Sequence, residues 1–295
     1  MTPDTNRIAA LLAVLDLADS DARTSEDIFT GVSQRMPLGR VYGGQVLAQS
    51  LVAAARTTPA DRVVHSMHGY FLRPGDSTKG ITFAVDRVHD GRSFSTRRTQ
   101  AYQDGVPIFS TIASFQDEGP GVEHHTPMPS GIPQPEDLPD LEDRLAGVHP
   151  LSKRLFTERT VDLRHVQPPI YASVADRAAQ QAVWLRTRGP LPDEPNAHRA
   201  ALAYMSDLTI QEPVLRAHGL PWTTPGLRLA SLDHAMWWHR FGRADEWVLY
   251  VQESPSARGG RGLSLGRMYS RDGELLANVA QEIMVRVPDA VTDGA

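Results

Sequence analysis

A G-x-S-x-G string lies at residues 262–266, and this pattern carries the nucleophilic serine of many hydrolases. That chemistry requires a sharp turn with a strand before it and a helix after it. Here the alternation of residues places Ser264 inside a predicted strand, which leads to a hairpin turn at Asp272-Gly273. We therefore predict that Ser264 is not a nucleophile.

Histidines occur in pairs, but none of the pairs has the spacing of metal ligands. His65 and His234 lie in predicted strands that would line a pocket, although a histidine in such a place is more often a structural, hydrogen-bonded residue. We predict no metal site. The pairs are His65 and His68, His124 and His125, and His234 and His239.

Three polar residues are predicted to point into the apolar core of the C-terminal half. Asp207 follows small residues on one face of a helix, because Ala200 and Ala203 share its face by spacing. Gln281 lies on the apolar side of an alternating strand. Ser231 follows two leucines at a spacing of two and four residues, so its side chain is expected on the same, apolar face of the strand as theirs. Such inward groups either satisfy one another or form a site for acid–base chemistry. The residues alone leave both open, and the first is the more common.

Composition narrows the function classes. The chain of 295 residues has a net charge of −5 and no cysteine. The missing cysteine excludes a thiol nucleophile, a cysteine zinc site and disulfides, and it fits a cytoplasmic location. The mild charge favours no nucleic-acid partner. The N-terminal apolar residues indicate an amphipathic helix and not a signal peptide, and no stretch is apolar enough for membrane insertion.

One pattern of a helix followed by an antiparallel meander occurs twice. Both copies contain an Asp-Gly hairpin, at Asp104-Gly105 and Asp272-Gly273. The first copy has a helix at 43–55 and strands at 63–73, 81–86, 94–102 and 106–115; the second has a helix at 196–210 and strands at 227–239, 247–253, 262–270 and 275–287.

The repeat predicts an α+β fold of two tandem units, each with a long helix packed on an antiparallel sheet. The second copy would continue the sheet of the first and cover its edge. We expect an N-terminal unit at 1–116, a Pro- and Gly-rich crossover with a short helix at 117–165, and a C-terminal unit at 166–295.

The chain resembles the acyl-CoA thioesterase II family of double hot-dog enzymes over nearly its full length. The resemblance rests on the joint order and spacing of several short strings, and no single string would be sufficient. The strings are VYGGQ (41–45), HSMHGYFLRPGD (65–76), DGRSFS (90–95), ASFQ (113–116), SDL (206–208), DHAMWWHR (233–240) and QE (281–282).

The resemblance implies a carboxylate, a hydroxyl and an amide that orient a water for attack on a thioester carbonyl. The family's aspartate falls on Asp207, its hydroxyl residue on Ser231 and its glutamine on Gln281. Relatives often have threonine where this chain has Ser231, so the oxygen is kept and the stiff branched side chain is lost. Asp207 would act as the base, and no cofactor, metal or acyl-enzyme is required.

The resemblance also implies the substrate, a medium- to long-chain fatty acyl-CoA of fatty acid metabolism, and self-association into a homo-oligomer. Candidate substrate-binding residues are Gly43, Gly44, His65 and Arg92. The glycines begin a helix and offer backbone amides to an oxyanion. Arg73, Arg92, Arg97 and Arg98 are candidates for the CoA phosphates.

The first copy lacks the polar trio, so we expect one site per chain. Pairing the copies by eye places Ala113 opposite Gln281 and Val52 or Ala53 opposite Asp207. Two other functions remain open: a hot-dog hydratase or dehydratase, which would need a histidine and an acid aimed at the acyl chain, and an acyl-CoA binding module without catalysis.

Overall fold

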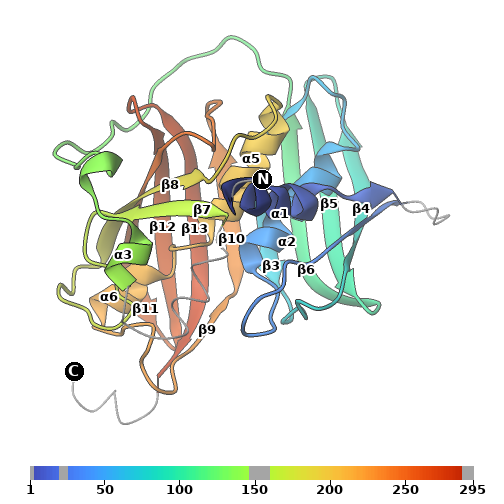
Figure 1. The fold of residues 1–295 in the computed structure, drawn as a ribbon. Coiled ribbons are helices and arrows are strands. Elements are labelled where there is room, and N and C mark those ends of the chain that lie inside the picture. The colour runs from blue at the N-terminus through green and yellow to red at the C-terminus, as the bar shows by residue number, and fades with distance from the viewer. Residues whose placement is uncertain (1–2, 20–25, 146–159, 288–295) are drawn as a thin grey trace.

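The computed structural model describes residues 3–19, 26–145 and 160–287. The N-terminal half begins with a helix that packs beside the second helix of the chain (Figure 1). Its elements are α1 (Pro3–Leu15), β1 (Ala18–Asp19), β2 (Asp27–Gly31), α2 (Gly43–Ala55), β3 (Val63–Phe71), β4 (Ile81–Asp90), β5 (Phe94–Gln103) and β6 (Val106–Gln116).

The C-terminal half follows a segment that passes over the molecule from β6 to the opposite side (Figure 1). Its elements are η1 (Pro135–Asp137), α3 (Leu141–Leu145), β7 (Val161–His165), β8 (Gln180–Thr187), α5 (Pro195–Ser206), α6 (Glu212–Ala217), β9 (Arg228–Ser231), β10 (Asp233–Trp238), β11 (Val248–Arg258), β12 (Arg261–Ser270) and β13 (Leu275–Arg286).

The two halves share one antiparallel sheet, as the repeat predicts. In the described residues it has 13 strands in the order β1-β2-β4-β5-β6-β3-β10-β13-β12-β11-β8-β7, and β9 pairs with β13 beside this path. The halves meet where β3 pairs with β10, with Met67 opposite Met236. Both methionines are fully buried, and α2 packs against α5 over this junction.

The predicted hairpins are present. Asp104 and Gly105 adopt positive φ of 51° and 75° between β5 and β6, which a two-residue hairpin of this kind requires. Gly273 has φ of 91° between β12 and β13. The string at 262–266 lies inside β12, so the sequence-based placement of Ser264 within a strand is confirmed.

Several elements differ from the prediction. β2 and β8 were not predicted, because β2 is short and β8 is buried on both faces and shows no alternation. The strand predicted at 227–239 is broken at Leu232 into β9 and β10. The helix predicted to reach Ile210 ends at Ser206. The predicted crossover at 117–165 ends in β7, which pairs with β8 and so belongs with the C-terminal sheet. Of the helix predicted near 141–156, α3 is described, and residues 146–159 lie outside the described residues.

One large core extends through both halves and includes apolar residues of α1, α2, α5 and the facing strands. None of the helices in the described ranges is long and apolar enough to cross a membrane.

Candidate functional site

Asp207 lies at the end of α5, where the chain leaves the helix. Ala200 and Ala203 on this helix are fully buried, which lets α5 approach α2 closely. As the C-cap residue, Asp207 turns its carboxylate toward the first turn of α2, and it is only 6% exposed. The carboxylate therefore belongs to the C-terminal half but contacts the N-terminal half.

Two glycines at the start of α2 permit this contact. Gly44 donates its backbone N–H to Asp207 Oδ2 at 2.9 Å. A Cβ on Gly43 would lie 2.6 Å from that oxygen, and one on Gly44 would lie 2.3 Å from the carbonyl oxygen of Tyr204. Tyr42 links the same helix ends, because its hydroxyl donates to Tyr204 O at 2.7 Å. Neither glycine position accepts a side chain unless α2 and α5 move apart.

The three predicted residues form one hydrogen-bonded group. The amide nitrogen of Gln281 donates to Asp207 Oδ1 and to Ser231 Oγ, both at 2.9 Å. The hydroxyl of Ser231 donates to Asp207 Oδ1 at 3.3 Å. The pairing of β9 with β13 brings the hydroxyl and the amide together, because Ser231 lies opposite Ile283, two residues from Gln281.

Burial controls the charge of Asp207. It raises the pKa of this carboxyl to about 6, while hydrogen bonds from Gln281, Gly44 and Ser231 act in the opposite direction. The negative end of the α5 dipole disfavours a carboxylate at this place, and the positive end of α2 favours it. The group is thus mainly ionised at pH 7, with a basicity suited to accepting a proton near that pH.

His234 on β10 lies directly behind Gln281. Its Nδ1 is 2.5 Å from Gln281 Oε1, and its Nε2 is 2.9 Å from Ser206 Oγ. Burial lowers the pKa of His234 to about 4, so the ring is neutral at pH 7. The sequence left this histidine as a structural residue, and the structure connects it to the predicted trio.

Gln211 was missed from the sequence. Its side-chain amide donates to Ser231 Oγ at 3.2 Å. The signal was a polar side chain four residues after Asp207, which places the two side by side when the chain turns helically. No feature of the sequence distinguished it from a solvent-facing glutamine.

Ser264 is buried on β12 and lies opposite Gln281 in the strand register. Its position within a continuous strand denies it the exposed turn of a nucleophile elbow. No hydrogen-bond partner of its hydroxyl is found within the described part of the chain.

The other candidate binding residues divide into two groups. Gly43 and Gly44 lie at the trio, whereas His65 and Arg92 do not. His65 bonds to Ser114 Oγ at 2.8 Å. His234 pairs with Gly69 on β3, and His65 lies four residues before Gly69 on the same strand. This separation along the strand is about 13 Å. Arg92 is exposed between β4 and β5.

The remaining arginines suggested for CoA phosphates are also separate from the trio. Arg97 is buried and pairs with Asp90 at 2.7 Å, so its charge is already matched. Arg98 pairs with Asp86 at 3.1 Å, and Arg73 donates to a backbone carbonyl at 2.9 Å. The sequence identified these cations but neither the burial of Arg97 nor the partners of the others.

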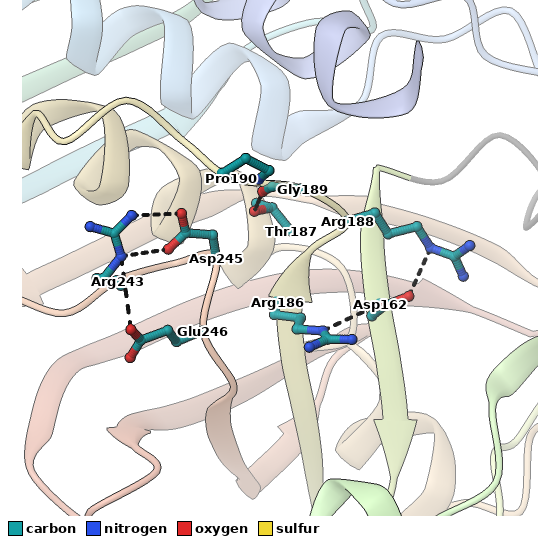
Figure 2. Close-up of a pocket in the computed structure, with 9 residues that line it drawn as sticks. All are labelled: Asp162, Arg186, Thr187, Arg188, Gly189, Pro190, Arg243, Asp245 and Glu246. Atoms are coloured by element: carbon teal, nitrogen blue, oxygen red, sulfur yellow. Dashed lines mark hydrogen bonds and ion pairs between the residues drawn. The ribbon is translucent and has the colours of Figure 1, made fainter. Parts of the chain in front are cut away.

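A pocket of about 500 Å³ lies elsewhere in the C-terminal half, where three arginines and three carboxylates face one another (Figure 2). Arg186 and Arg188 both bind Asp162, at 3.1 and 2.8 Å, and Arg243 binds Asp245 at 2.8 Å. These mutual pairs leave little positive charge for an anion. Within the described ranges, no three His, Asp or Glu side chains gather as metal ligands.

Comparisons with known proteins identify the family of the chain. A family profile described as "Acyl-CoA thioesterase" matches residues 157–284, and one described as "Acyl-CoA thioesterase N-terminal domain" matches residues 32–116. The chain is 36% identical to "Acyl-coenzyme A thioesterase 8" of Homo sapiens, with 99% of this chain and 93% of that protein covered. It is also 36% identical to "Acyl-CoA thioesterase 2" of Haemophilus influenzae, over 88% of this chain and 92% of that protein.

Solved structures show the same fold. The acyl-CoA thioesterase II TesB2 of Mycobacterium marinum is 41% identical, with a TM-score of 0.74 over 95% of this chain and 98% of that chain. A hot-dog protein of Alicyclobacillus acidocaldarius, 20% identical, has a TM-score of 0.77 over 95% of this chain and 98% of that chain and supports the fold alone. The predicted α+β double hot-dog architecture is confirmed, and the chain belongs to the acyl-CoA thioesterase II family.

Proposed function

We propose that this protein hydrolyses medium- to long-chain fatty acyl-CoA by direct attack of water, with Asp207 as the base. The observation that carries the proposal is a buried carboxylate with a pKa of about 6, held by Gln281, Ser231 and the start of α2. Family membership supports a thioester hydrolase, since the names of the relatives above state acyl-CoA thioesterase activity.

The oxygens of Asp207 are not equivalent. Oδ1 accepts hydrogen bonds from Gln281 and Ser231, whereas Oδ2 accepts one from Gly44. Oδ2 therefore has a lone pair with which to take a proton from water. The water oxygen bonds to the thioester carbon, the carbon–sulfur bond breaks, and the proton passes to the departing CoA sulfur. The products are the free acid and CoA.

The developing oxyanion needs a donor other than Gly44. The N–H of Gly44 is already given to Asp207, so it holds the base, and the sequence-based assignment of this amide to the oxyanion does not fit the described state. Gly43 begins α2, and no acceptor for its N–H occurs among the described residues. We assign the oxyanion contact to this amide, which the α2 dipole strengthens.

The proposal includes a cytoplasmic homo-oligomer. The absence of cysteine fits a reducing compartment. Exposed apolar side chains on the outer sheet face, such as Tyr70 at 63% and Ile112 at 51%, favour contact with another subunit. Light scattering at micromolar protein would contradict this part if it showed a strict monomer.

The two other functions have less support. A hydratase needs a histidine free to exchange protons with the acyl chain, but both ring nitrogens of His234 are engaged inside the protein. A binding module without catalysis would need no ionisable base in the site, and it would leave the raised pKa of Asp207 without a role.

One assay separates the three functions. The protein is incubated with acyl-CoA substrates of increasing chain length, with free CoA followed by a thiol reagent and the acyl group by mass spectrometry. Released CoA with an unchanged acyl group supports the proposal, and activity should be highest with medium to long chains. A changed acyl group still attached to CoA identifies a hydratase, and bound but unaltered substrate identifies a binding module.

A further inference from the structure

We propose that His234 is a positioning residue: its Nδ1–H holds the Gln281 amide in the orientation that directs both amide N–H groups to Asp207 and Ser231. This inference deepens the proposed function and rests on it. His234 does not contact the reacting atoms, so it acts only through Gln281.

The surroundings of Gln281 distinguish the two ends of its amide. On one side lie Asp207 Oδ1 and Ser231 Oγ, both 2.9 Å from the amide nitrogen. On the other side lies His234 Nδ1, next to the amide oxygen. A flipped amide would place two acceptors, Gln281 Oε1 and the carboxylate, against each other. The carboxylate therefore requires the observed orientation, and Oε1 then requires a donor behind it.

His234 supplies that donor in one tautomer. In a neutral ring only one nitrogen carries a proton. With the proton on Nδ1, the ring donates to Gln281 Oε1, and Nε2 accepts the hydroxyl proton of Ser206 at 2.9 Å. This hydroxyl has one proton and also lies 2.8 Å from the carbonyl oxygen of Ala203, so the tautomer requires the proton to turn from that carbonyl to Nε2. The alternative tautomer would set Nδ1 and Gln281 Oε1 against each other as two acceptors. In the first arrangement the hydroxyl donates to the ring, the ring to the amide, and the amide to Asp207.

Burial makes this chain necessary. His234, Ser206 and Gln281 are all fully buried, so solvent water does not replace a lost donor. A buried amide oxygen without a partner costs about 1–3 kcal/mol, which is enough to favour rotation of the amide. Rotation would withdraw the N–H groups from the base and from the hydroxyl beside it.

A matched pair of variants tests the proposal. In His234→Asn the side-chain amide nitrogen occupies about the place of Nδ1, whereas in His234→Gln it occupies about the place of Nε2. We expect His234→Asn to keep kcat within about 5-fold of the parent, and His234→Gln to lower it by about 10- to 100-fold with little change in KM. Equal losses in the two variants, or a smaller loss in His234→Gln, would show that the ring serves only for packing.

The pH profile provides a readout that packing alone would not move. The amide N–H groups lower the pKa of Asp207, so their loss should shift the acid limb of kcat/KM to higher pH in His234→Gln but not in His234→Asn. Among the described residues, Tyr250 on β11 interacts electrostatically with this carboxylate and stays neutral because burial raises its pKa. His234 reaches the carboxylate only through Gln281, and burial lowers its pKa to about 4. An unshifted limb in His234→Gln would contradict the proposal.

The tautomer can be measured in the parent protein without any activity. Nitrogen-15 NMR of the ring at pH 7 should show a protonated Nδ1 and an unprotonated Nε2, with the ring assigned by its contacts to Gln281. A proton on Nε2 would overturn the positioning role even if every variant unfolded. If instead the parent released no CoA, the proposed function would fail while the tautomer result stood on its own.

Discussion

The two halves of the chain have the same arrangement of a helix and an antiparallel sheet. They differ where the second half carries the hydrogen-bonded group of Asp207, Ser231 and Gln281. The two Asp-Gly hairpins lie at corresponding places, before β6 in the first half and before β13 in the second. Counting eight residues from Gly105 and from Gly273, Ala113 in the first half corresponds to Gln281 in the second. The β-bulge beside each hairpin lies at the same point of this count. The first half therefore has an alanine where the second half has the amide.

His65 and His234, the two histidines that the sequence placed in strands near a pocket, bond to different partners. A register shift between Val64 and Ser66 leaves His65 as an extra residue in β3, where it bonds to Ser114. His234 on β10 bonds to Gln281. His65 therefore bonds within the N-terminal half, whereas His234 supports the polar group.

The helix ends differ as well. α5 closes on Asp207, whereas α2 closes on Arg56, whose guanidinium turns to the carbonyl of Leu17. A carboxylate at one helix end and an arginine at the other give the two halves opposite charges at equivalent cap positions. The inward amide and the helix cap therefore distinguish the half that carries the site from the half that does not.

The largest expected effect comes from changing the two caps. Asp207→Asn keeps the shape but removes the base, so kcat should fall by roughly two to four orders of magnitude while KM changes little. Arg56→Gln, the matched change at the other cap, should leave kcat within about 2-fold. Steady-state kinetics with one acyl-CoA tests both variants. Near-parental turnover in Asp207→Asn would remove the distinction between the two helix ends.

The contact between the halves can be broken at Gly44. A Cβ there would lie 2.3 Å from a backbone oxygen of α5, so Gly44→Ala should separate the helices and lower kcat by about 100-fold, with a lower Tm. Gly119→Ala is the control, because a Cβ at that position has no heavy atom within 4 Å. Equal behaviour of the two variants would mean that the close approach of α2 is unimportant.

Two serines, the half-buried Ser231 and the buried Ser264, test the assignment of the hydroxyl. Ser231→Ala should lower kcat by about 10- to 100-fold, because a group that orients water is lost but the base remains. Ser264→Ala should be nearly as active as the parent. The progress curve should show no burst of CoA, and mass spectrometry after rapid quench should find no acylated serine peptide. An acyl adduct on Ser231 would replace the direct mechanism with a covalent one.

A smaller effect is expected from pH. Asp207 must be ionised to accept a proton, so kcat/KM should rise with pH through an acid limb near 6, as given by the pKa of this group. A limb near pH 4 would mean that another, solvated carboxylate is the base.

The contribution of Asp207 to folding stability should fall as pH rises, whereas its contribution to activity rises. The pKa of Asp207 is about 6 in the folded state and 3.8 for an ordinary, solvated aspartate, so the folded state binds the proton more tightly than the unfolded state. This contribution is fully present below pH 4 and is lost as pH rises through 6, which amounts to roughly 3 kcal/mol. The unfolding free energy of Asp207→Asn relative to the parent should therefore increase over this interval in urea titrations. A constant difference would contradict the raised pKa.

Local signals in the sequence placed each member of the trio in the core, and the resemblance to the family then selected the three as a site. Asp207 followed alanines on a helix face, and Gln281 and Ser231 had the parity of apolar neighbours. These local signals are informative because the direction of a side chain in a helix or strand follows from its spacing alone. The repeat likewise predicted the shared sheet, since each unit has an apolar face and an open edge to cover.

The sequence did not predict what depends on register and long-range contact. That His234 and not His65 reaches the trio depends on how β10 lies beside β13, and an alternating pattern contains no information on strand order or register. The bond from Gly44 to Asp207 joins residues 163 positions apart, so neither local pattern contains it. The strand break at Leu232, which sets the position of Ser231, has no glycine or proline to mark it.

Gly44 donates its hydrogen bond to Asp207 across the contact between the two halves. The pKa of Asp207 therefore reports whether the two halves of the chain are in contact. Its donor and its carboxylate come from halves that the segment at 117–165 connects. A chain cleaved in that segment would regain an acid limb near pH 6 only after its fragments had reassociated. A fall in the apparent pKa of Asp207 toward the ordinary value of a carboxyl would accordingly reveal separation of α2 from α5, because the burial that raises this pKa would be lost.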